Sequence, residues 1–480
     1  MSRHNPILYR VFHSFPLAIF KCVQTSVTRD ISLEDCILDL IDNSIDSLVR
    51  TRDIDISANL LLPSTPANGH DKNSLPLIDV TLKEKMFKIV DKCGRISRES
   101  ALNEVFNFGH SKDGVTGQLG AYGIGLKRAI FKIGNSFEMI SKTPKEGFKT
   151  KIKISEWSRK DEDITDWTIP ITYINGASSK SAAGTSITIR ELRPEVEMRL
   201  REGSFEGLLY SRIAQTYSLF LQRHVRVKLN GKDIEPKRIP IGISDEVEPA
   251  KEELEEQFKD GLVKVIIIAG LAARGPNQDW PLEPAGWYIL CNGRVVVAAN
   301  KEDLTGWGVG LPSFHYKFRG FVGLVFFQSK NPLMLPWTTT KRGLNRESPI
   351  YQKARNKMVA LARPVITFIN RMYPSEAPEE RQERQIAQRT IAADIRDIVL
   401  KPTTTFKITP QKKAPPKTTV WIKYQAEVED VEKIKKCIRQ YTWSASKIGE
   451  HTFEHFLSTG QKRYLKMHKR PSQLYPFQEW

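Results

Sequence analysis

The spacing of apolar residues predicts an α-helix over residues 30–50 and a series of strands further along the chain. In ISLEDCILDLIDNSIDSLVR apolar residues occupy most of the helix surface, and Ser32 stands where a capping residue would begin it. Residues 77–91 are typical of two strands joined by a tight polar turn. Alternation predicts antiparallel strands in FEMISKT, FKTKIKISEW, TDWTIPITYI and GTSITIREL. Together these elements predict an α+β sandwich over residues 1–200, with helices on one sheet face.

A second α+β domain is predicted over residues 201–375. It opens with a helix that starts near Phe205, and strands are predicted in VRVKLNG, VKVIIIAGLA, GWYILCNGRVVVA and FRGFVGLVFF. An amphipathic helix from about Pro349 to Tyr373 closes this domain.

The rest of the chain is polar and basic. Residues 376–418 combine a charged helix, expected over 379–400, with a semi-extended linker rich in Pro, Thr and Lys. A small basic module is expected over 419–480. One helix in this module is predicted to pack on another surface through four apolar positions, Val428, Val431, Ile434 and Ile438.

Composition and charge indicate the class of partner. The chain of 480 residues carries 73 Lys and Arg against 55 Asp and Glu, a formal net charge of +18. This excess indicates a polyanion such as DNA, although a soluble basic protein without such a partner has the same composition. No apolar run reaches the roughly 20 residues that a membrane helix needs. Five scattered cysteines without a CxxC pair argue against disulfides and favour a cytoplasmic location, or a nuclear one in a eukaryote.

Three polar residues interrupt the apolar surface of the helix predicted over 30–50. Asp39, Asn43 and Asp46 are spaced by four and three residues, so they share one helical face. Their carboxylate and amide oxygens are hard ligands that suit Mg²⁺. Taken alone, such a stripe is more often the solvated face of an amphipathic helix.

A glycine-rich segment, FNFGHSKDGVTGQLGAYGIGLKRAIFKIG, leads into a helix that starts near Leu126. Glycines just before a helix allow the backbone to approach a phosphate group and to point free N–H groups at it. Lys127 adds a positive charge to the first turn, where a bound anion would balance it. The spacing matches neither the Walker pattern nor the dinucleotide fingerprint.

Two shorter elements complete the pattern. IVDKCGRIS places Asp91 at a strand end, where its carboxylate could accept a hydrogen bond from an exocyclic amine, and Gly94 then bends the chain. Thr185 lies at the start of the strand GTSITIREL. Each element alone is an ordinary turn or strand start.

In this order, the four elements resemble the motifs of the GHKL ATPase superfamily, which includes gyrase B, heat-shock ninety-kilodalton chaperones, histidine kinases, MutL and MORC. DLIDNSIDS is similar to the helix with the catalytic carboxylate, and IVDKCGRI to the adenine-binding loop. LGAYGIGLK is similar to the end of the ATP lid, and GTSITI to the last nucleotide motif. FGHSK and YGIGLK look most like MORC and related bacterial proteins. The resemblance covers about 30–190 and implies a GHKL α/β sandwich that binds ATP and Mg²⁺.

The resemblance also assigns roles to individual residues. Asp39 stands at the position of the family's general-base Glu, and Asn43 at that of its Mg²⁺ ligand. Asp91 would accept a hydrogen bond from the adenine amino group, and Thr185 would support it. Further nucleotide contacts are expected from Asp46, Gly94, Ile96, Ser111, Lys112, Gly120, Ala121, Tyr122, Gly123, Ile124, Gly125, Leu126 and Lys127.

Two departures from the family pattern affect these roles. Asp39 is one methylene shorter than Glu, whereas a general base must come within roughly 2.6–3.2 Å of its water. Slow hydrolysis is therefore expected, with Glu34 as a second candidate base. The adenine loop carries Cys93 and Arg95 where the family usually has glycines, and Arg95 is expected at the pocket mouth.

Residues 201–375 resemble the transducer domain (S5-type) that follows the ATPase domain in gyrase B, MutL and MORC. NPLMLPWTTTKRGLN is similar to the transducer loop that reaches back to the γ-phosphate. Lys341 is assigned as the switch lysine, with Arg342 as the second candidate. The alternative is a basic surface loop.

The C-terminal segment suits either a nucleic-acid partner or a solubilising role. Residues 401–480 carry about sixteen Lys and Arg against seven Asp and Glu. In QKRYLKMHKR, Tyr464 lies among cations, an arrangement that suits base stacking and phosphate pairing. A solubilising tail has the same composition.

The sequence thus predicts an ATP-dependent molecular clamp that dimerises on binding ATP and traps DNA without sequence preference. Roles in DNA compaction or anti-phage defence, with the protein partners of such systems, follow from the resemblance alone. Two other classes stay open, a nucleotide-sensing scaffold with little hydrolysis and a protein-remodelling chaperone. A histidine kinase is not expected, because no helical His box precedes the ATPase motifs.

Overall fold

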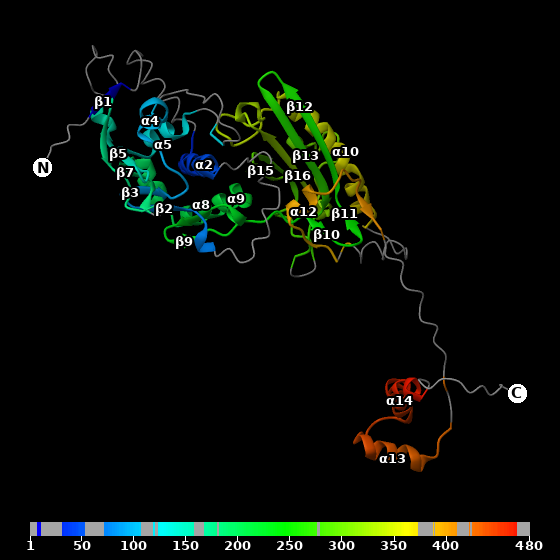
Figure 1. Cartoon of the computed structure of the whole chain (residues 1–480). Helices are drawn as coiled ribbons and strands as arrows, with labels where there is room; N and C mark the ends of the chain where they lie inside the picture. Colours follow the sequence, from blue (N-terminus) through cyan, green and yellow to red (C-terminus); the bar gives the residue numbers. More distant parts are fainter. Residues whose placement is uncertain are drawn as a thin grey trace. The chain divides into compact units, whose positions relative to one another are not determined.

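The computed structural model divides the chain into two compact units, Met1–Gln411 and Lys412–Trp480 (Figure 1). It describes residues 7–10, 31–52, 72–106, 119–120, 123–157, 168–179, 182–275, 279–372, 387, 389–409, 422 and 425–467. Within these ranges the first unit contains two large β-sheets. Each sheet and the helices that pack on it form one lobe, and we call them the first and the second lobe in chain order.

The sheet of the first lobe is mainly antiparallel, and its described strands follow the order β1-β6-β5-β4-β7-β3-β2-β8-β9. β2 and β3 form the hairpin predicted over 77–91, and β4, β5, β6 and β7 are the four predicted antiparallel strands. The prediction of a sheet from alternating residues is therefore confirmed. The bounds are β1 Ile7–Arg10, β2 Leu77–Lys83, β3 Met86–Asp91, β4 Gly134–Lys142, β5 Glu146–Lys153, β6 Thr168–Asn175, β7 Gly184–Leu192, β8 Arg226–Leu229 and β9 Lys232–Asp233.

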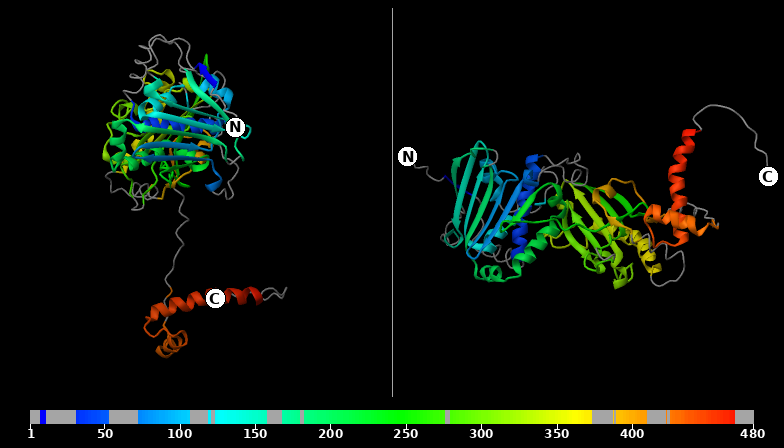
Figure 2. Two further views of the ribbon diagram at one scale, coloured as in Figure 1. Left: turned by 90° about the vertical axis from the view of Figure 1, so that its left-hand side faces the viewer. Right: turned by 90° about the horizontal axis from the view of Figure 1, so that it is seen from below.

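The helix α2 (Leu33–Arg52) lies on the face of this sheet that turns toward the second lobe (Figure 2). Ser32 caps it as predicted, because its Oγ accepts a hydrogen bond from the Asp35 backbone N–H at 3.2 Å. The helix is buried on nearly all sides, and of its polar stripe Asp39 and Asp46 are buried whereas Asn43 is exposed. The other short helices of this lobe are η1 Lys72–Ser74, α4 Arg98–Ser100, η2 Ala101–Val105, α5 Gly125–Ile133, α6 Ile154–Trp157 and α7 Pro194–Arg201.

The sheet of the second lobe has the order β12-β13-β16-β14-β15 in the described part of the chain. Every residue of β16 is buried, because β13 and β14 pair with it on both sides and α10 packs against it. The predicted amphipathic helix from Pro349 is α10. The bounds are β12 Ala250–Phe258, β13 Gly261–Leu271, β14 Gly286–Cys291, β15 Arg294–Asn300, η4 Asp303–Thr305, η5 Tyr316–Gly320, β16 Phe321–Ser329, η6 Pro332–Met334 and α10 Pro349–Arg371.

The junction of the two lobes differs from the expectation. The strand expected in VRVKLNG is β8, which pairs in parallel with β2 and extends the first sheet beyond residue 200, where the first domain was expected to end. The helix expected from Phe205 is two helices, α8 (Phe205–Thr216) and α9 (Ser218–Arg223). They separate because Tyr217 leaves the helical conformation, with φ −106° and ψ 23°.

The segment after α10 also differs. The helix expected over 379–400 is wrong at β17, which pairs with β10, and α12 covers only the last part of that range. The linker expected after residue 400 contains a short strand, β18, which pairs with β11. These pairings hold the chain on the second lobe up to Thr409, whose N–H donates to the Glu246 carbonyl. The bounds are β10 Gly242–Ile243, β11 Val247–Glu248, β17 Ile391–Ala392, α12 Ile395–Val399 and β18 Lys407–Ile408.

In its described residues the C-terminal unit contains α13 (Val428–Ile438) and α14 (Ala445–Met467), which contact each other. Val431, Ile434 and Ile438 are partly buried, as the predicted packed face requires, but Val428 is exposed. Tyr464 and the cations around it lie outside the described side chains. No helix in the part of the chain that the structure describes is long and apolar enough to cross a membrane.

Candidate functional site

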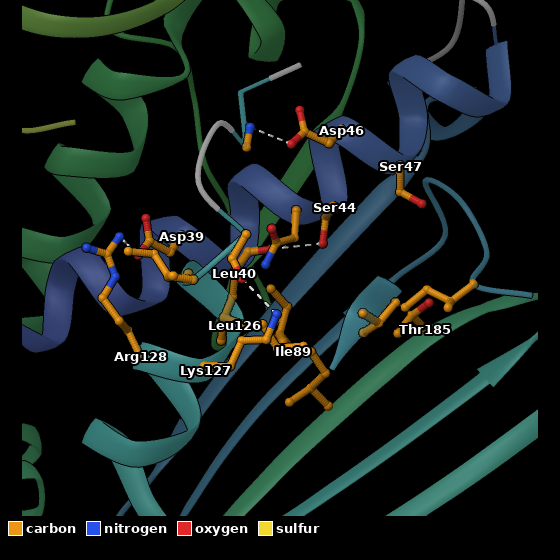
Figure 3. Close-up of a pocket in the computed structure, with 18 of the residues that line it drawn as sticks. Asp39, Leu40, Ser44, Asp46, Ser47, Ile89, Leu126, Lys127, Arg128 and Thr185 are labelled. Carbon is orange, nitrogen blue, oxygen red and sulfur yellow. Dashed lines mark hydrogen bonds and ion pairs between the residues drawn. The ribbon is translucent and has the colours of Figure 1, made fainter. Parts of the chain in front are cut away.

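A cavity of about 180 Å³ opens where α2, the end of β3, the start of α5 and the second lobe meet. The close-up shows side chains from α2 and α5 facing Thr185 across it (Figure 3). The cavity therefore joins all four predicted motifs. The predicted residues that line it are Asp39, Asn43, Asp46, Asp91, Ile96, Gly120, Gly123, Ile124, Gly125, Leu126, Lys127, Thr185 and Lys341.

One end of the cavity contains a buried carboxylate, Asp91, the last residue of β3. Its side chain accepts hydrogen bonds from Ser44 Oγ at 3.3 Å and from the backbone N–H of Cys93 at 3.2 Å. Burial raises the pKa of Asp91 to about 7, against these hydrogen bonds. A Cβ atom on Gly94 would lie 1.9 Å from Ser47 Oγ, so this turn requires glycine. Thr185 shares a hydrogen bond of 3.1 Å with Ser141 on the neighbouring strand.

Asp46 fixes the chain at the end of the glycine-rich segment. Its two carboxylate oxygens accept hydrogen bonds from the backbone N–H groups of Leu119 at 2.6 Å and Gly120 at 2.7 Å. A Cβ on Gly120 would lie 2.7 Å from Asp46 Oδ2, which explains the glycine. Burial raises the pKa of Asp46 to about 6. Asp46, predicted as a nucleotide ligand, here binds backbone N–H groups at the edge of the cavity.

The start of α5 brings two buried cations to the cavity. The Lys127 ammonium donates to the Gly123 carbonyl at 2.7 Å, and burial lowers its pKa to about 7. Arg128 follows it, and its guanidinium forms an ion pair of 2.7 Å with Asp39 (Figure 3). The α5 backbone approaches α2 closely, since a Cβ on Gly125 would lie 3.1 Å from the Asp39 Cβ.

The Asp39 carboxylate is therefore paired with a guanidinium and has little contact with solvent. The side chains of Arg128 and Asp39 are 6% and 3% exposed. Burial raises the pKa of Asp39, and the charges of Lys341 and Arg128 oppose that rise. Arg128 was not among the predicted site residues. Its position directly after Lys127 was the available signal, but nothing local indicates that it turns toward Asp39.

A second buried carboxylate, Asp42, connects α2 to the second lobe. It is 0% exposed and accepts hydrogen bonds from Lys341 Nζ at 2.7 Å, Arg294 Nε at 3.1 Å and Tyr217 OH at 2.6 Å. Burial alone raises the pKa of Asp42, but the charges of Arg294 and Lys341 lower it, and the net shift is downward. Of this group only Lys341 was predicted from the sequence, and the contacts that join its members are long-range.

The other predicted residues are elsewhere. Glu34 pairs with Arg199 at 2.6 Å and does not line the cavity, so the geometry does not favour it as a second base. Arg342, the second candidate for the switch residue, pairs with Asp35 at the start of α2. Arg95 is exposed and is also absent from the cavity lining. The remaining predicted contacts lie outside the described residues: Ser111, Lys112, Ala121 and Tyr122.

The donor set fits a Mg²⁺ ion that is bound mainly by phosphates and water. Asn43 is exposed in the cavity, whereas its neighbours on the stripe, Asp39 and Asp46, are engaged by other groups. Among the described residues no cluster of three His, Cys, Asp or Glu side chains could hold a metal by itself. Mg²⁺ commonly keeps several waters and takes few protein ligands beside a nucleotide. One amide oxygen from Asn43 is consistent with that mode.

Residues 31–185 match the family model described as Histidine kinase-, DNA gyrase B-, and HSP90-like ATPase. This span, about a third of the chain, includes α2, the Asp91 strand, the start of α5 and Thr185. A search of curated proteins finds no match. The family match supports the GHKL superfamily and ATP binding for this part of the chain.

Proposed function

We propose that this protein is a GHKL-type molecular clamp that binds Mg²⁺ and ATP, hydrolyses ATP slowly, dimerises on binding ATP and holds DNA. The observation that carries the proposal is the cavity itself. It has an amine acceptor, Asp91, at one end, and two cations, Lys127 and Arg128, at the start of a helix. An adenine amine and a polyphosphate require these two environments.

The proposed chemistry follows from the side chains that line the cavity. Asp91 accepts a hydrogen bond from the adenine amino group, and Lys127 pairs with the phosphates. Asn43 holds the metal, which when bound offsets phosphate charge. Asp39 takes the proton of the attacking water. Its ion pair with Arg128 reduces its basicity, which is one reason to expect slow turnover.

The second lobe is proposed to act as the transducer. Lys341 and Thr339 of this lobe line the cavity, so a nucleotide there would contact both lobes. A change between ATP and ADP can then alter how the second lobe is held, as a switch requires. MORC-like DNA compaction and anti-phage defence rest on the sequence resemblance.

A second candidate is an ATP-sensing scaffold with little or no hydrolysis. The buried ion pair between Asp39 and Arg128 favours it, because a carboxylate held by a guanidinium is less available to a water molecule. Measuring phosphate release separates the two candidates. Steady turnover that DNA stimulates supports the clamp, and ATP binding without turnover supports the scaffold.

Light scattering tests the clamp directly. A non-hydrolysable ATP analogue should double the mass of the full chain in solution, and ADP should leave it monomeric. Equal masses with both nucleotides would contradict an ATP-driven clamp.

We expect ATP affinity to be highest near pH 7 and to fall on both sides. Below about pH 7 Asp91 becomes protonated and keeps only a weaker, neutral acceptor for the adenine amine, since burial raises its pKa to about 7. Above about pH 7 Lys127 loses its proton and its attraction for phosphate, since burial lowers its pKa to about 7. The alkaline limb should approach about tenfold per pH unit, and the acid limb should be shallower. Calorimetric titration with Mg·ATP from pH 5.5 to 8.5 measures both limbs.

Lys127→Arg is the matched control, because an arginine stays protonated over this range. Its alkaline limb should disappear while its acid limb remains. Since the same nucleotide is titrated in both proteins, the ionisation of ATP itself cancels in the comparison. An alkaline limb that persists in Lys127→Arg would show that another group causes it.

DNA binding should weaken steeply with salt, because each neutralised phosphate releases counterions. Residues 412–480, the C-terminal unit, carry 14 Lys and Arg against 7 Asp and Glu. Deleting this unit should reduce the slope of log affinity against log salt and leave ATP affinity unchanged. Gel shifts with two unrelated duplexes at several salt concentrations measure the slope and the lack of sequence preference. An unchanged slope would place the DNA surface on the first unit.

A further inference from the structure

The cluster around Asp42 contains more positive charge than one carboxylate needs. Lys341 Nζ and Arg294 Nε lie 2.7 and 3.1 Å from its two oxygens, and the Tyr217 hydroxyl donates at 2.6 Å. Both cations come from the second lobe, and the aspartate belongs to α2. The cluster is buried, since Asp42, Arg294 and Lys341 are 0%, 4% and 6% exposed.

Arg294 is placed by a rigid turn. Asn292 and Gly293 have positive φ angles of 45° and 80°, and they turn the chain from β14 into β15. The Asn292 side chain is tied to β16, because its Nδ2 donates to the Ser329 carbonyl and its Oδ1 accepts from the Ser329 N–H, both at 3.0 Å. The guanidinium of Arg294, the next residue, is therefore fixed relative to the second sheet.

Arg294 also holds the backbone of the loop that carries Lys341. Its Nη1 donates to the Lys341 carbonyl at 2.9 Å, while its Nε donates to Asp42. Lys341 has φ 55°, a left-handed conformation that is unfavourable for a residue with a Cβ. The Arg294 guanidinium thus binds both the Asp42 carboxylate and the backbone of Lys341, the second cation that pairs with this carboxylate.

Lys341 lies between Asp42 and the cavity. Its ammonium forms an ion pair with Asp42 in this structure, and the residue also lines the cavity, as Asp39 does. Movement of the ammonium toward a phosphate in the cavity would leave Asp42 with one cation. A buried carboxylate without any cation is strongly unfavourable, so the exchange requires that Arg294 stays in place.

We propose that Arg294 is a positioning residue for Lys341: by keeping Asp42 neutralised, it frees the lysine to exchange Asp42 for the terminal phosphate of ATP. This inference rests on the proposed function, in which Lys341 contacts that phosphate. It adds a resting partner, Asp42, and a reason for a second buried cation from the same lobe. Through this exchange ATP weakens one contact between the lobes, the ion pair of Lys341 with Asp42. ADP does not weaken it, because ADP lacks the terminal phosphate.

The experiment compares ATP and ADP binding in variants of the full chain. Affinities for a non-hydrolysable ATP analogue and for ADP are measured by calorimetry with Mg²⁺, and turnover by phosphate release. Arg294→Met should bind ADP like wild type but lose about tenfold of the preference for the ATP analogue, because Lys341 is then the sole cation on Asp42. Turnover should fall by a similar factor.

The double variant Arg294→Met/Asp42→Asn supplies the decisive comparison. With the carboxylate gone, Lys341 is no longer retained, and the preference for the ATP analogue should return to within about threefold of wild type. Arg294→Lys, which keeps a cation beside Asp42, should likewise keep the preference. If the double variant is as poor as Arg294→Met, or Arg294→Lys loses the preference, the inference is overturned.

Lys341→Met distinguishes failure of this inference from failure of the proposed function. It should itself lose the preference for the ATP analogue. If Lys341→Met keeps it, the switch role of Lys341 is wrong. If Lys341→Met loses it and Arg294→Met does not, the switch role stands and the role of Arg294 is wrong. Should Arg294→Met fail to fold, loss of the preference in the double variant or in Arg294→Lys still overturns the inference, since both leave no unpaired charge at Asp42.

Discussion

Replacing Asp39 by asparagine should lower ATP turnover by about a hundredfold or more and leave ATP affinity within about threefold of wild type. An amide cannot take the proton of the attacking water, but its oxygen can still accept the hydrogen bond from Arg128 that Asp39 accepts at 2.7 Å. The buried guanidinium thus keeps a partner, and the fold should be retained. Single-turnover phosphate release measures the rate, and calorimetry measures the affinity.

Two further variants test whether Asp39 is the base. Asp39→Glu should keep or raise turnover, because the longer side chain restores the reach that the family's Glu provides. Glu34→Gln should not change turnover, since Glu34 pairs with Arg199 and does not line the cavity. If Asp39→Asn hydrolyses ATP normally while Glu34→Gln does not, the base has been assigned to the wrong residue.

Arg128 decides how the Asp39 result is to be understood. Arg128→Met removes the cation that pairs with Asp39. It should alter turnover far more than the affinity for ATP, because Asp91 at the adenine end of the cavity is unchanged. A rise in turnover would mean that the ion pair restrains the base. A fall would mean that a buried Asp39 needs the cation to stay ionised.

The first lobe and the outline of the cavity could be predicted from local patterns. Ser32 marks the start of α2 because capping chemistry is contained in a few neighbouring residues. The glycines around α5 could be identified for a similar reason. Gly125 leaves no more than 3.1 Å between an added Cβ and the Asp39 Cβ, and a close approach of this kind selects glycine in any sequence.

The contacts between the lobes could not be predicted in this way. Asp42 binds Arg294 and Lys341, which are 252 and 299 residues away, and no local period relates them. The pairing of β8 with β2 is long-range as well, so the sequence pattern did not predict that β8 joins the first sheet. A sequence pattern can relate charges that lie close in the chain, such as Arg396 and Asp394, but not partners this far apart.

Replacing Asn43 by alanine should lower the affinity for ATP in the presence of Mg²⁺ by about a hundredfold. Asn43 is the exposed residue of the polar stripe on α2, and in the described residues no hydrogen bond engages its side chain. Its removal should cost little stability, within about 0.5 kcal/mol, because alanine is a good helix former and no buried partner is lost. Calorimetry with Mg²⁺ and with EDTA measures the two affinities.

The effect should be confined to the metal-dependent part of the affinity. In EDTA, Asn43→Ala and wild type should bind ATP almost equally, because Asp91 and Lys127 are unchanged in both proteins. Asn43→Asp, which keeps an oxygen at the same position, should retain most of the affinity with Mg²⁺, since a carboxylate is also a hard ligand. A protein in which alanine binds Mg·ATP as tightly as asparagine does would exclude Asn43 as the ligand.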